Sequence, residues 1–499
     1  MRLTTNKTKN GISYYIIRSV RRDGKRSSEV VERLGTEREI MEKYHCTDAN
    51  KWAKAHLDEL NQAEAEKQHK VLVPLRTDIL IPFDKQNSYN VGYLFLQKIY
   101  YDLRLPNICR KISKEYSFSY DLDSILSRLV YERILNPSSK LSCYEQSSDL
   151  LEPPAFELHQ IYRALSVIAN ESDSIQAELY EASRRLVKRQ TGVLYYDCTN
   201  YFFETECQEG LKQYGPSKEH RPSPIVEMGL FIDRSGIPLA FCIHPGNTNE
   251  QTTLIPLEEQ ILRDFSLSKF IVCTDAGLSS ERNRKFNNFG GRCFITTQSI
   301  KKLKKDLRQW CLEPTGWHLK DSLDTYDISR LEDTAKNRSK LFYKQLYVEG
   351  NDGKRDIDFD QTLIVTYSLK YRNYQQQIRN QQILRAIKAI DTEPKRIDKH
   401  SQNDYRRFIK KTSITAYGEC AANKIYEIDQ DAVQEEAQYD GFYAVYTNLD
   451  DDPSEIAAVN QGRWEIEESF RIMKSEFEAR PVYLKRDDRI KAHFTTCFI

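Results

Sequence analysis

The sequence lacks the long hydrophobic runs that mark membrane proteins and secreted proteins. No window approaches the roughly 20 consecutive apolar residues that a membrane-spanning helix needs. The polar start, MRLTTNKTKN, has no apolar core of the kind found in a signal peptide. We therefore expect a soluble, intracellular protein with no membrane partner.

The sequence also lacks the cysteine spacing of a disulfide framework or a zinc site. Its eleven cysteines are an odd number, are scattered along the chain and include no CxxC pair. Disulfide-rich domains and structural zinc sites instead repeat cysteines at fixed short spacings. We expect reduced thiols, mostly in the core.

An excess of charge of either sign is absent as well. The 74 Lys and Arg residues nearly balance the 73 Asp and Glu residues, which leaves a net charge of +1. Any nucleic-acid surface must therefore be local. At 499 residues the chain is too long for one core, and about 150 residues per domain suggests about three units.

The first part of the chain changes from a strand pattern to a helical pattern. Residues 12–35 alternate apolar and polar positions around an Asp-Gly turn, which predicts a β-hairpin. Its tip is basic and is either solvated or in contact with DNA: Arg21, Arg22, Lys25 and Arg26. Residues 88–190 have helical spacing, with a break at 136–140. These helices either hold duplex DNA or form a plain bundle.

Residues 191–297 are rich in strand patterns and predict a mixed α/β sheet. Three strands partly joined by hairpins are followed by a helix and two further strands. Residues 300–438 are charged, with two strand-like pieces and one helical piece. A further strand and a long helix over 454–479 follow. We found no internal repeat.

Two aspartates follow apolar strands of this region. Asp197 lies where the strand VLYY meets Cys-Thr-Asn, and Asp275 ends the strand IVCT. Ligands gather at the carboxyl ends of strands in open α/β sheets, so both positions suit chemistry. An aspartate at a strand end also commonly serves as a turn or cap residue, and that alternative stays open.

The late helix has a polar face beside an apolar one. At about 100° per residue, its polar positions fall within roughly 60° of one another. They are Asn460, Arg463, Glu467 and Lys474. The neighbouring apolar stripe consists of Ile466, Phe470, Met473 and Phe477. This polar face is either a functional site or a solvated salt-bridge face, for which pairing between Arg463 and Glu467 would suffice.

These residues carry a resemblance to the DDE insertion-sequence transposases. RWEIEESFRIMK contains Arg, three residues, Glu, six residues and Lys, and resembles the later part of that group's Tyr-x2-Arg-x3-Glu-x6-Lys signature. YYDCTNYFFE resembles the segment of the first aspartate, and CTDAGLSS resembles that of the second. Asn460 stands where the signature has tyrosine.

The resemblance implies a ribonuclease H-like mixed α/β fold. The catalytic core would comprise residues 191–300 and 439–499, with residues 301–438 forming a large β-rich insertion between the second aspartate and the glutamate. A helical DNA-binding region over 71–190 and a small N-terminal β/α module over 1–70 would precede it.

The resemblance also implies a chemistry. Asp197, Asp275 and Glu467 would hold two Mg²⁺ ions, for which Mn²⁺ could substitute, since carboxylates suit such hard cations. Arg463 and Lys474 would bind phosphates. The expected protein is a prokaryotic, nucleoid-associated transposase that binds terminal inverted repeats and cleaves and joins DNA. Its partners would be double-stranded transposon ends and target DNA, and it would act as a homodimer.

Further DNA contacts are expected from scattered residues. Lys218, His220 and Arg221 in SKEHRP would contact the backbone of a transposon end, and Asn460 would replace the tyrosine contact. For His220, a metal ligand, a general base or a plain loop residue are the alternatives. A base turned out of the stack could rest on Trp310 or Trp317, or both rings could simply pack in the core.

A second function remains open. Asn460 departs from the signature, and the chain stops at HFTTCFI within an apolar run. Both features would suit a catalytically inactive or truncated transposase-derived protein that still binds DNA. A nuclease or hydrolase of the same fold is a third alternative.

Overall fold

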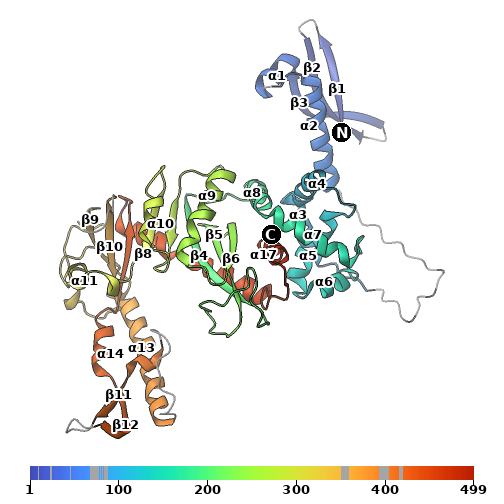
Figure 1. The fold of residues 1–499 in the computed structure, drawn as a ribbon. Coiled ribbons are helices and arrows are strands. Elements are labelled where there is room, and N and C mark those ends of the chain that lie inside the picture. Colours follow the sequence, from blue (N-terminus) through green and yellow to red (C-terminus); the bar gives the residue numbers. More distant parts are fainter. Residues whose placement is uncertain are drawn as a thin grey trace. The chain divides into compact units, whose positions relative to one another are not determined.

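The chain folds into two compact units. The computed structural model describes residues 1–8, 11–22, 25–44, 46–67, 78, 80, 83, 88–349, 359–392, 404–414 and 420–499. One unit comprises residues 1–101 and 148–153, and the other comprises 102–147 and 154–499 (Figure 1). Across these ranges no helix combines the length and the apolar character that crossing a bilayer requires. The structure shows no disulfide among the cysteines that it describes.

The first unit contains a three-stranded antiparallel sheet of β1 (Arg2–Thr8), β2 (Gly11–Arg22) and β3 (Lys25–Thr36). The helices of this unit are α1 (Glu37–Tyr44), α2 (Ala49–Lys67) and α3 (Tyr93–Asp102). β2 and β3 form the expected hairpin, and β1 adds a strand beside it. The Asp-Gly turn and the side chains of the basic tip lie outside the described residues.

A helical region opens the second unit, as expected from the spacing of residues 88–190. Its helices are α4 (Leu105–Glu115), α5 (Leu122–Leu135), α6 (Lys140–Ser147), α7 (Leu158–Asn170) and α8 (Ser172–Ser183). The last helix of the chain, α17 (Asp487–Phe498), packs against α7. Ser166 donates a hydrogen bond of 2.6 Å to Asp488 at this contact.

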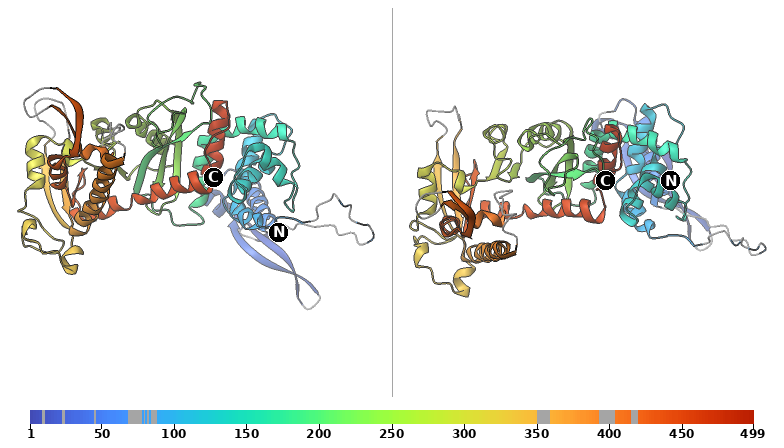
Figure 2. Two further views of the ribbon diagram at one scale, coloured as in Figure 1. Left: turned by 90° about the horizontal axis from the view of Figure 1, so that it is seen from below. Right: turned by 60° about the horizontal axis from the view of Figure 1, so that its bottom comes forward.

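One large mixed sheet forms the centre of the second unit (Figures 1 and 2). Its strand order is β6-β5-β4-β7-β8-β13-β10-β9. The strands are β4 (Val193–Phe202), β5 (Ile225–Asp233), β6 (Pro238–Pro245), β7 (Ile271–Thr274), β8 (Cys293–Thr297), β9 (Phe342–Val348), β10 (Gln361–Tyr367) and β13 (Phe442–Thr447). β4, β7 and β8 run parallel, and every other neighbouring pair is antiparallel.

Two apolar clusters cover the two faces of this sheet. The helices α9 (Leu254–Asp264) and α10 (Glu281–Phe286) connect the central strands, and α9 packs its apolar side on one face. The chain's late helices pack on the other face: α15 (Pro453–Gln461), α16 (Trp464–Arg471) and the π-helical segment η6 (Ile472–Glu476). β5 is buried along its whole length, as a strand covered on both faces should be.

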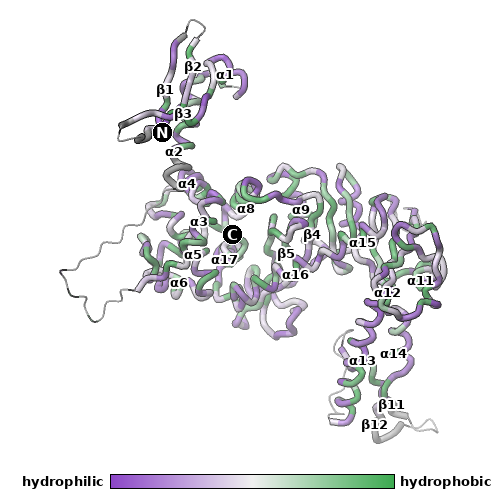
Figure 3. Tube along the Cα trace, turned by 180° about the vertical axis from the view of Figure 1, so that it is seen from behind, coloured by the Kyte–Doolittle hydropathy of each residue, from purple (hydrophilic) through white to green (hydrophobic). Residues whose placement is uncertain are grey.

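Residues 301–438 contribute both to this sheet and to a separate group of elements. β9 and β10 extend the sheet beyond β13, because each edge strand offers backbone groups that the next strand satisfies. The long helix α13 (Leu369–Thr392), the helix α14 (Gln430–Ala437) and the hairpin of β11 (Ile409–Ile414) and β12 (Cys420–Ile428) follow. The short helix α11 (Lys305–Leu312) precedes β9. After Leu369 the first half of α13 is hydrophilic, and hydrophobic positions are mixed in from Ile378 onwards (Figure 3).

A buried ion pair fastens the β5–β6 turn. Nε of Arg189 donates to Asp233 at 2.6 Å, and the two side chains are 4% and 0% exposed. We expect Asp233→Ala to lower the free energy of unfolding by about 3–5 kcal/mol, because it leaves the Arg189 charge buried without its partner. The matched control is Glu181→Ala, which breaks an exposed pair with Arg184 and should cost about 0–1 kcal/mol. Equal shifts of the two thermal unfolding midpoints would contradict this assignment.

Candidate active site

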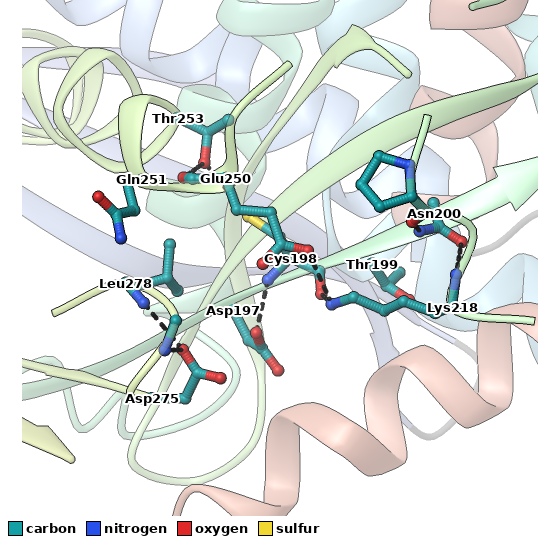
Figure 4. A network of polar contacts seen from close by, with 12 residues as sticks. Asp197, Cys198, Thr199, Asn200, Lys218, Glu250, Gln251, Thr253, Asp275 and Leu278 are labelled. Carbon is teal, nitrogen blue, oxygen red and sulfur yellow. Dashed lines mark hydrogen bonds and ion pairs between the residues drawn. The ribbon is translucent and has the colours of Figure 1, made fainter. Parts of the chain in front are cut away.

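Strand register brings Asp197 and Asp275 together. The parallel pair β4–β7 ends with Tyr195 opposite Cys273. Each aspartate follows its member of that pair by two residues, and side chains two residues apart share a face of the sheet. Asp275 directly follows the last residue of β7, and Figure 4 shows its carboxyl group beside that of Asp197 on β4. The pairing of β4 with β7 in this register is therefore what places the two acids side by side.

The sequence predicted Asp197 at the end of its strand, and that prediction is wrong. β4 continues to Phe202, because its antiparallel neighbour β5 pairs with it along that whole stretch. What ends near Asp197 is the parallel pairing with β7. The aspartate therefore lies at a change of neighbour within the sheet.

Each aspartate uses one carboxylate oxygen to hold the backbone. Oδ1 of Asp197 accepts a hydrogen bond of 2.8 Å from the amide of Cys198. Oδ1 of Asp275 accepts from the amides of Gly277 and Leu278, at 2.9 and 3.1 Å (Figure 4). The turn role that the sequence left open for Asp275 is therefore real. Oδ1 is used in this way in both residues, and the second oxygen can serve another ligand.

The late helix lies along β4 on the face that carries Asp197. The Tyr195 hydroxyl donates to the carbonyl of Val459 at 2.8 Å. Four residues further along the strand, Thr199 accepts from Nζ of Lys474 at 2.6 Å. Asp197 is midway between these two contacts and on the same face. The strand and the helix thus run in the same direction, and the middle of the helix lies over Asp197.

The sequence predicted one long helix over 454–479, but the structure has three segments there, α15, α16 and η6. Between α15 and α16 the backbone tightens, with the Gly462 amide bonded to the Val459 carbonyl and that of Arg463 to Asn460. A Cβ on Gly462 would overlap the Tyr195 hydroxyl, so the glycine permits this close contact. Lys474 lies in the π-helical segment η6, and such segments often occur at functional sites.

The negative charge of Asp197 is destabilised because the side chain is buried. Burial raises its pKa to about 6; Lys218 lowers it and the neighbouring Asp275 raises it further. Arg463 also lowers this pKa from the late helix. The cationic neighbours of the carboxylate are therefore Lys218 on one side and Arg463 on the other.

Lys474 is also partly removed from water. Burial lowers its pKa to about 8, and the nearby Lys218 charge acts in the same direction. Its ammonium group lies 5.5 Å from the centre of the Tyr201 ring and donates to Thr199. This lysine is held next to β4 by its contact with Thr199. That it acts together with the acids stays a prediction.

Two glutamates of the site were missed from the sequence. Glu227 on β5 is 3% exposed, and burial together with its neighbour Glu250 raises its pKa to about 8. Lys218 donates to the carbonyl of Cys198 and lies 3.1 Å from Glu250 (Figure 4). Glu227 pairs across the sheet with Asn200. Strand alternation could have indicated Glu227, a charged residue inside the apolar run IVEMGLF.

Glu467 lies on the same helix but faces outwards. It is exposed on α16 and lines a cavity of about 490 Å³ together with Arg463 and Trp464. Among the described residues, no three His, Cys, Asp or Glu side chains lie close enough to hold a metal ion. The structure therefore brings Asp197 and Asp275 together, and it places Glu467 nearby without joining it to them.

The remaining expected DNA contacts have different surroundings. Asn460 is 4% exposed, donates to the Tyr443 hydroxyl at 2.8 Å and accepts from Cys273, so it is a core residue in this structure. Trp317 is 0% exposed and donates to the Glu313 carbonyl, which leaves no face for a base. Core packing, the alternative kept for this ring, accounts for it.

Trp310 is only partly buried, and Lys344 lies 4.7 Å from its ring centre. His220 is exposed at a turn with φ of 56°. Arg221 is exposed too, with its guanidinium 4.1 Å from the centre of the Phe202 ring. These three side chains can reach a ligand from the surface. Lys218 is exposed as well, but its ammonium group already contacts the Cys198 carbonyl and Glu250.

The donor set at Asp197 and Asp275 suits a hard divalent cation. Two like-charged carboxylates on adjacent strands repel each other, and burial adds to the cost of the Asp197 charge. A cation with oxygen ligands would reverse that cost. The residues present therefore fit such an ion, and Asp197 and Asp275 would hold it.

Comparison with known proteins identifies the family of the chain. Residues 208–499, more than half of the chain, match the transposase DDE domain family. The chain belongs to this family, which generally depends on divalent metal ions. The matched stretch contains Asp275 and Glu467 and begins after Asp197. No curated protein matches the chain.

Solved structures give more distant likenesses. The piggyBac transposase synaptic complex with hairpin DNA is 9% identical, with a TM-score of 0.34, and the match covers 78% of this chain and 69% of that one. The Mos1 transposase paired-end complex with the left transposon end is 12% identical, with a TM-score of 0.15. That match covers 35% of this chain and 58% of the Mos1 chain.

The contact between Gly462 and Tyr195 can be tested by adding one methyl group. We expect Gly462→Ala to destabilise the protein by about 1–3 kcal/mol, because the new Cβ cannot fit without moving the helix from β4. Gly192→Ala is the control, since a Cβ there meets nothing within 4 Å. The measurement is the thermal unfolding midpoint of each full-length variant. A Gly462 variant as stable as the Gly192 variant would show that the helix does not approach β4 so closely.

Proposed function

We propose that the protein is a DNA transposase whose reaction centre is formed by Asp197, Asp275 and Glu467. The observation that carries this proposal is the placement of Asp197 beside Asp275, under a helix that bears Glu467 between two cations, Arg463 and Lys474. Membership of the transposase DDE domain family supports it. Closure of Glu467 onto the two aspartates accompanies binding of metal and DNA.

The fold around this site supports a ribonuclease H-like core. β4, β5 and β6 form an antiparallel meander, and β7 and β8 then continue parallel to β4. In this proposal residues 191–300 and 439–499 form the core and residues 301–438 the insertion. Residues 71–190 and the module at 1–70 bind DNA. The chain then represents the Tyr-Arg-Glu-Lys group with asparagine at the first signature position.

Magnesium is the proposed cofactor, held as two ions by the three carboxylates, with Mn²⁺ able to replace it. When bound, a pair of such ions activates a water or a 3′-hydroxyl and stabilises the leaving oxygen of the phosphodiester. Water and the 3′-hydroxyl then serve as alternative nucleophiles, so one site performs strand cleavage and strand transfer.

The cations of the site have separate tasks in this proposal. Arg463 offers a planar fork to two phosphate oxygens, and Lys474 offers a point charge from the π-helical segment. Lys218 keeps β4 and Glu250 in place through its contacts with the Cys198 carbonyl and the glutamate. The exposed side chains of His220 and Arg221 contact the DNA backbone. The substrates are double-stranded transposon ends with terminal inverted repeats and target DNA, bound by a homodimer.

A second candidate function is DNA binding without cleavage. The observation that favours it is the outward position of Glu467, together with the absence of a metal-binding trio among the described side chains. Under this alternative the protein would bind transposon ends and leave supercoiled DNA intact at every Mg²⁺ concentration. The nicking experiment below therefore separates the two functions.

The central prediction concerns nicking of a supercoiled plasmid that carries candidate transposon ends. The wild-type protein should convert it to nicked and linear forms with Mg²⁺ and not with excess chelator. Asp197→Asn, Asp275→Asn and Glu467→Gln should each abolish conversion, because each removes an acidic ligand of the cation. Gel analysis of the plasmid forms over time is the measurement.

The matched control is Glu468→Gln on the same helix. Glu468 pairs with Arg471 at 2.6 Å on the surface, so its loss should leave nicking unchanged. Activity that survives Glu467→Gln, or that disappears equally in both variants, would remove Glu467 from the site.

A further prediction concerns Lys474. We expect Lys474→Gln to slow single-turnover nicking by about 10²-fold, because the variant loses a charge aimed at the reacting phosphate. Arg471→Gln is the control, since Arg471 is exposed and pairs with Glu468 and Glu476. Equal rates in the two variants would leave Lys474 a purely structural contact to Thr199.

A further inference from the structure

The helix α13 carries a polar stripe that contains no acidic residue. At about 100° per residue, six of its residues fall within an arc of roughly 80°. They are Lys370, Tyr374, Gln377, Gln381, Arg385 and Lys388, and all six are exposed. We call this set the α13 stripe. The first acidic residue of the helix is Asp391, beyond the last member of the stripe.

The opposite side of α13 is neutralised and fixed to the protein. Arg379 makes two hydrogen bonds of 2.6 Å to Asp440, and Ala386 is fully buried. Arg407 donates to Gln382 at 2.6 Å. Helix α13 therefore has a docked side whose charge is paired. On the stripe, by contrast, the three cations Lys370, Arg385 and Lys388 form no ion pair with an acidic residue among the described residues.

The stripe begins at the cavity that Glu467 lines. Lys370 and Tyr374 line the cavity of about 490 Å³ that Glu467 and Arg463 also line. From there the stripe extends along the helix as far as Lys388, over about 27 Å at about 1.5 Å per residue. One turn of B-form DNA measures roughly 34 Å, so the stripe can follow most of one turn.

We propose that the α13 stripe binds the sugar-phosphate backbone of a DNA duplex whose end lies at the candidate active site. This inference rests on the proposed function and adds the surface that holds the duplex next to the reacting phosphate. Lysine and arginine neutralise phosphates, while glutamine and tyrosine side chains donate hydrogen bonds to phosphate oxygens. Such contacts read no bases, so binding along the stripe is independent of sequence.

The test uses the full-length protein and a fluorescein-labelled 30-base-pair duplex of arbitrary sequence. Fluorescence anisotropy gives the binding constant across a series of salt concentrations. The double variant Arg385→Gln/Lys388→Gln removes two cations far from Glu467. Its slope of log K against log salt should be shallower than that of the wild type by about 1.8, because each phosphate contact contributes about 0.9.

Two control variants make the result specific. Lys336→Gln/Lys340→Gln removes the same charge from residues 301–438 outside the stripe and should keep the wild-type slope. Arg385→Lys/Lys388→Arg retains the charge on the stripe and should keep it as well. Circular dichroism melting curves that match the wild type confirm that all three variants are folded.

The outcomes separate this inference from the proposed function. A stripe variant with the wild-type slope, in a protein that still nicks plasmid through Glu467, overturns the stripe alone and leaves an acidic protein as its partner. Equal slope losses in the Lys336/Lys340 variant also overturn it, because the effect would then follow total charge. A wild-type protein that neither binds duplex nor nicks plasmid refutes the proposed function first.

Discussion

The site depends on how the late helix is held along β4. At one end the Tyr195 hydroxyl bonds the Val459 carbonyl, in the space that Gly462 leaves open, and at the other end Lys474 bonds Thr199. Asp197 lies between these two contacts, in a position where burial makes its charge costly. Opposite charges from Lys218 and Arg463 offset part of that cost. The same geometry places the Glu467 helix over the pair of aspartates.

Much of this arrangement was predictable from local pattern. The alternation and length of the apolar segments predicted β4 to β8. The helical period predicted a common face for Arg463, Glu467 and Lys474, but in the structure Lys474 contacts Thr199 while Glu467 is exposed. The spacing could not show that β4 runs past Asp197, because that depends on its pairing with β5. It also could not show the π-helical segment that contains Lys474.

Burial explains why some residues that were predicted to contact DNA do not face the surface. Asn460 and Trp317 carry groups that suit DNA contacts, yet each has its polar atoms satisfied inside the protein. Glu227 is the opposite case, because it stands out as a charged residue inside an apolar strand but its partners lie on other segments of the chain. Only the pairing of β5 with β4 brings it towards Lys218 and Glu250. Side-chain type alone therefore says little until the neighbouring strands are known.

The eight-stranded sheet has a mechanical consequence. β9 and β10 share hydrogen bonds with β13, and β13 is bonded to β8 in the sheet that carries both aspartates. Helix α13 follows directly after β10, so its base is tied through continuous backbone bonding to the strands that present the acids. A DNA duplex bound along that helix would therefore lie at a fixed distance from the two aspartates. That distance, and not the base sequence at the cleaved bond, would then set the position of cleavage.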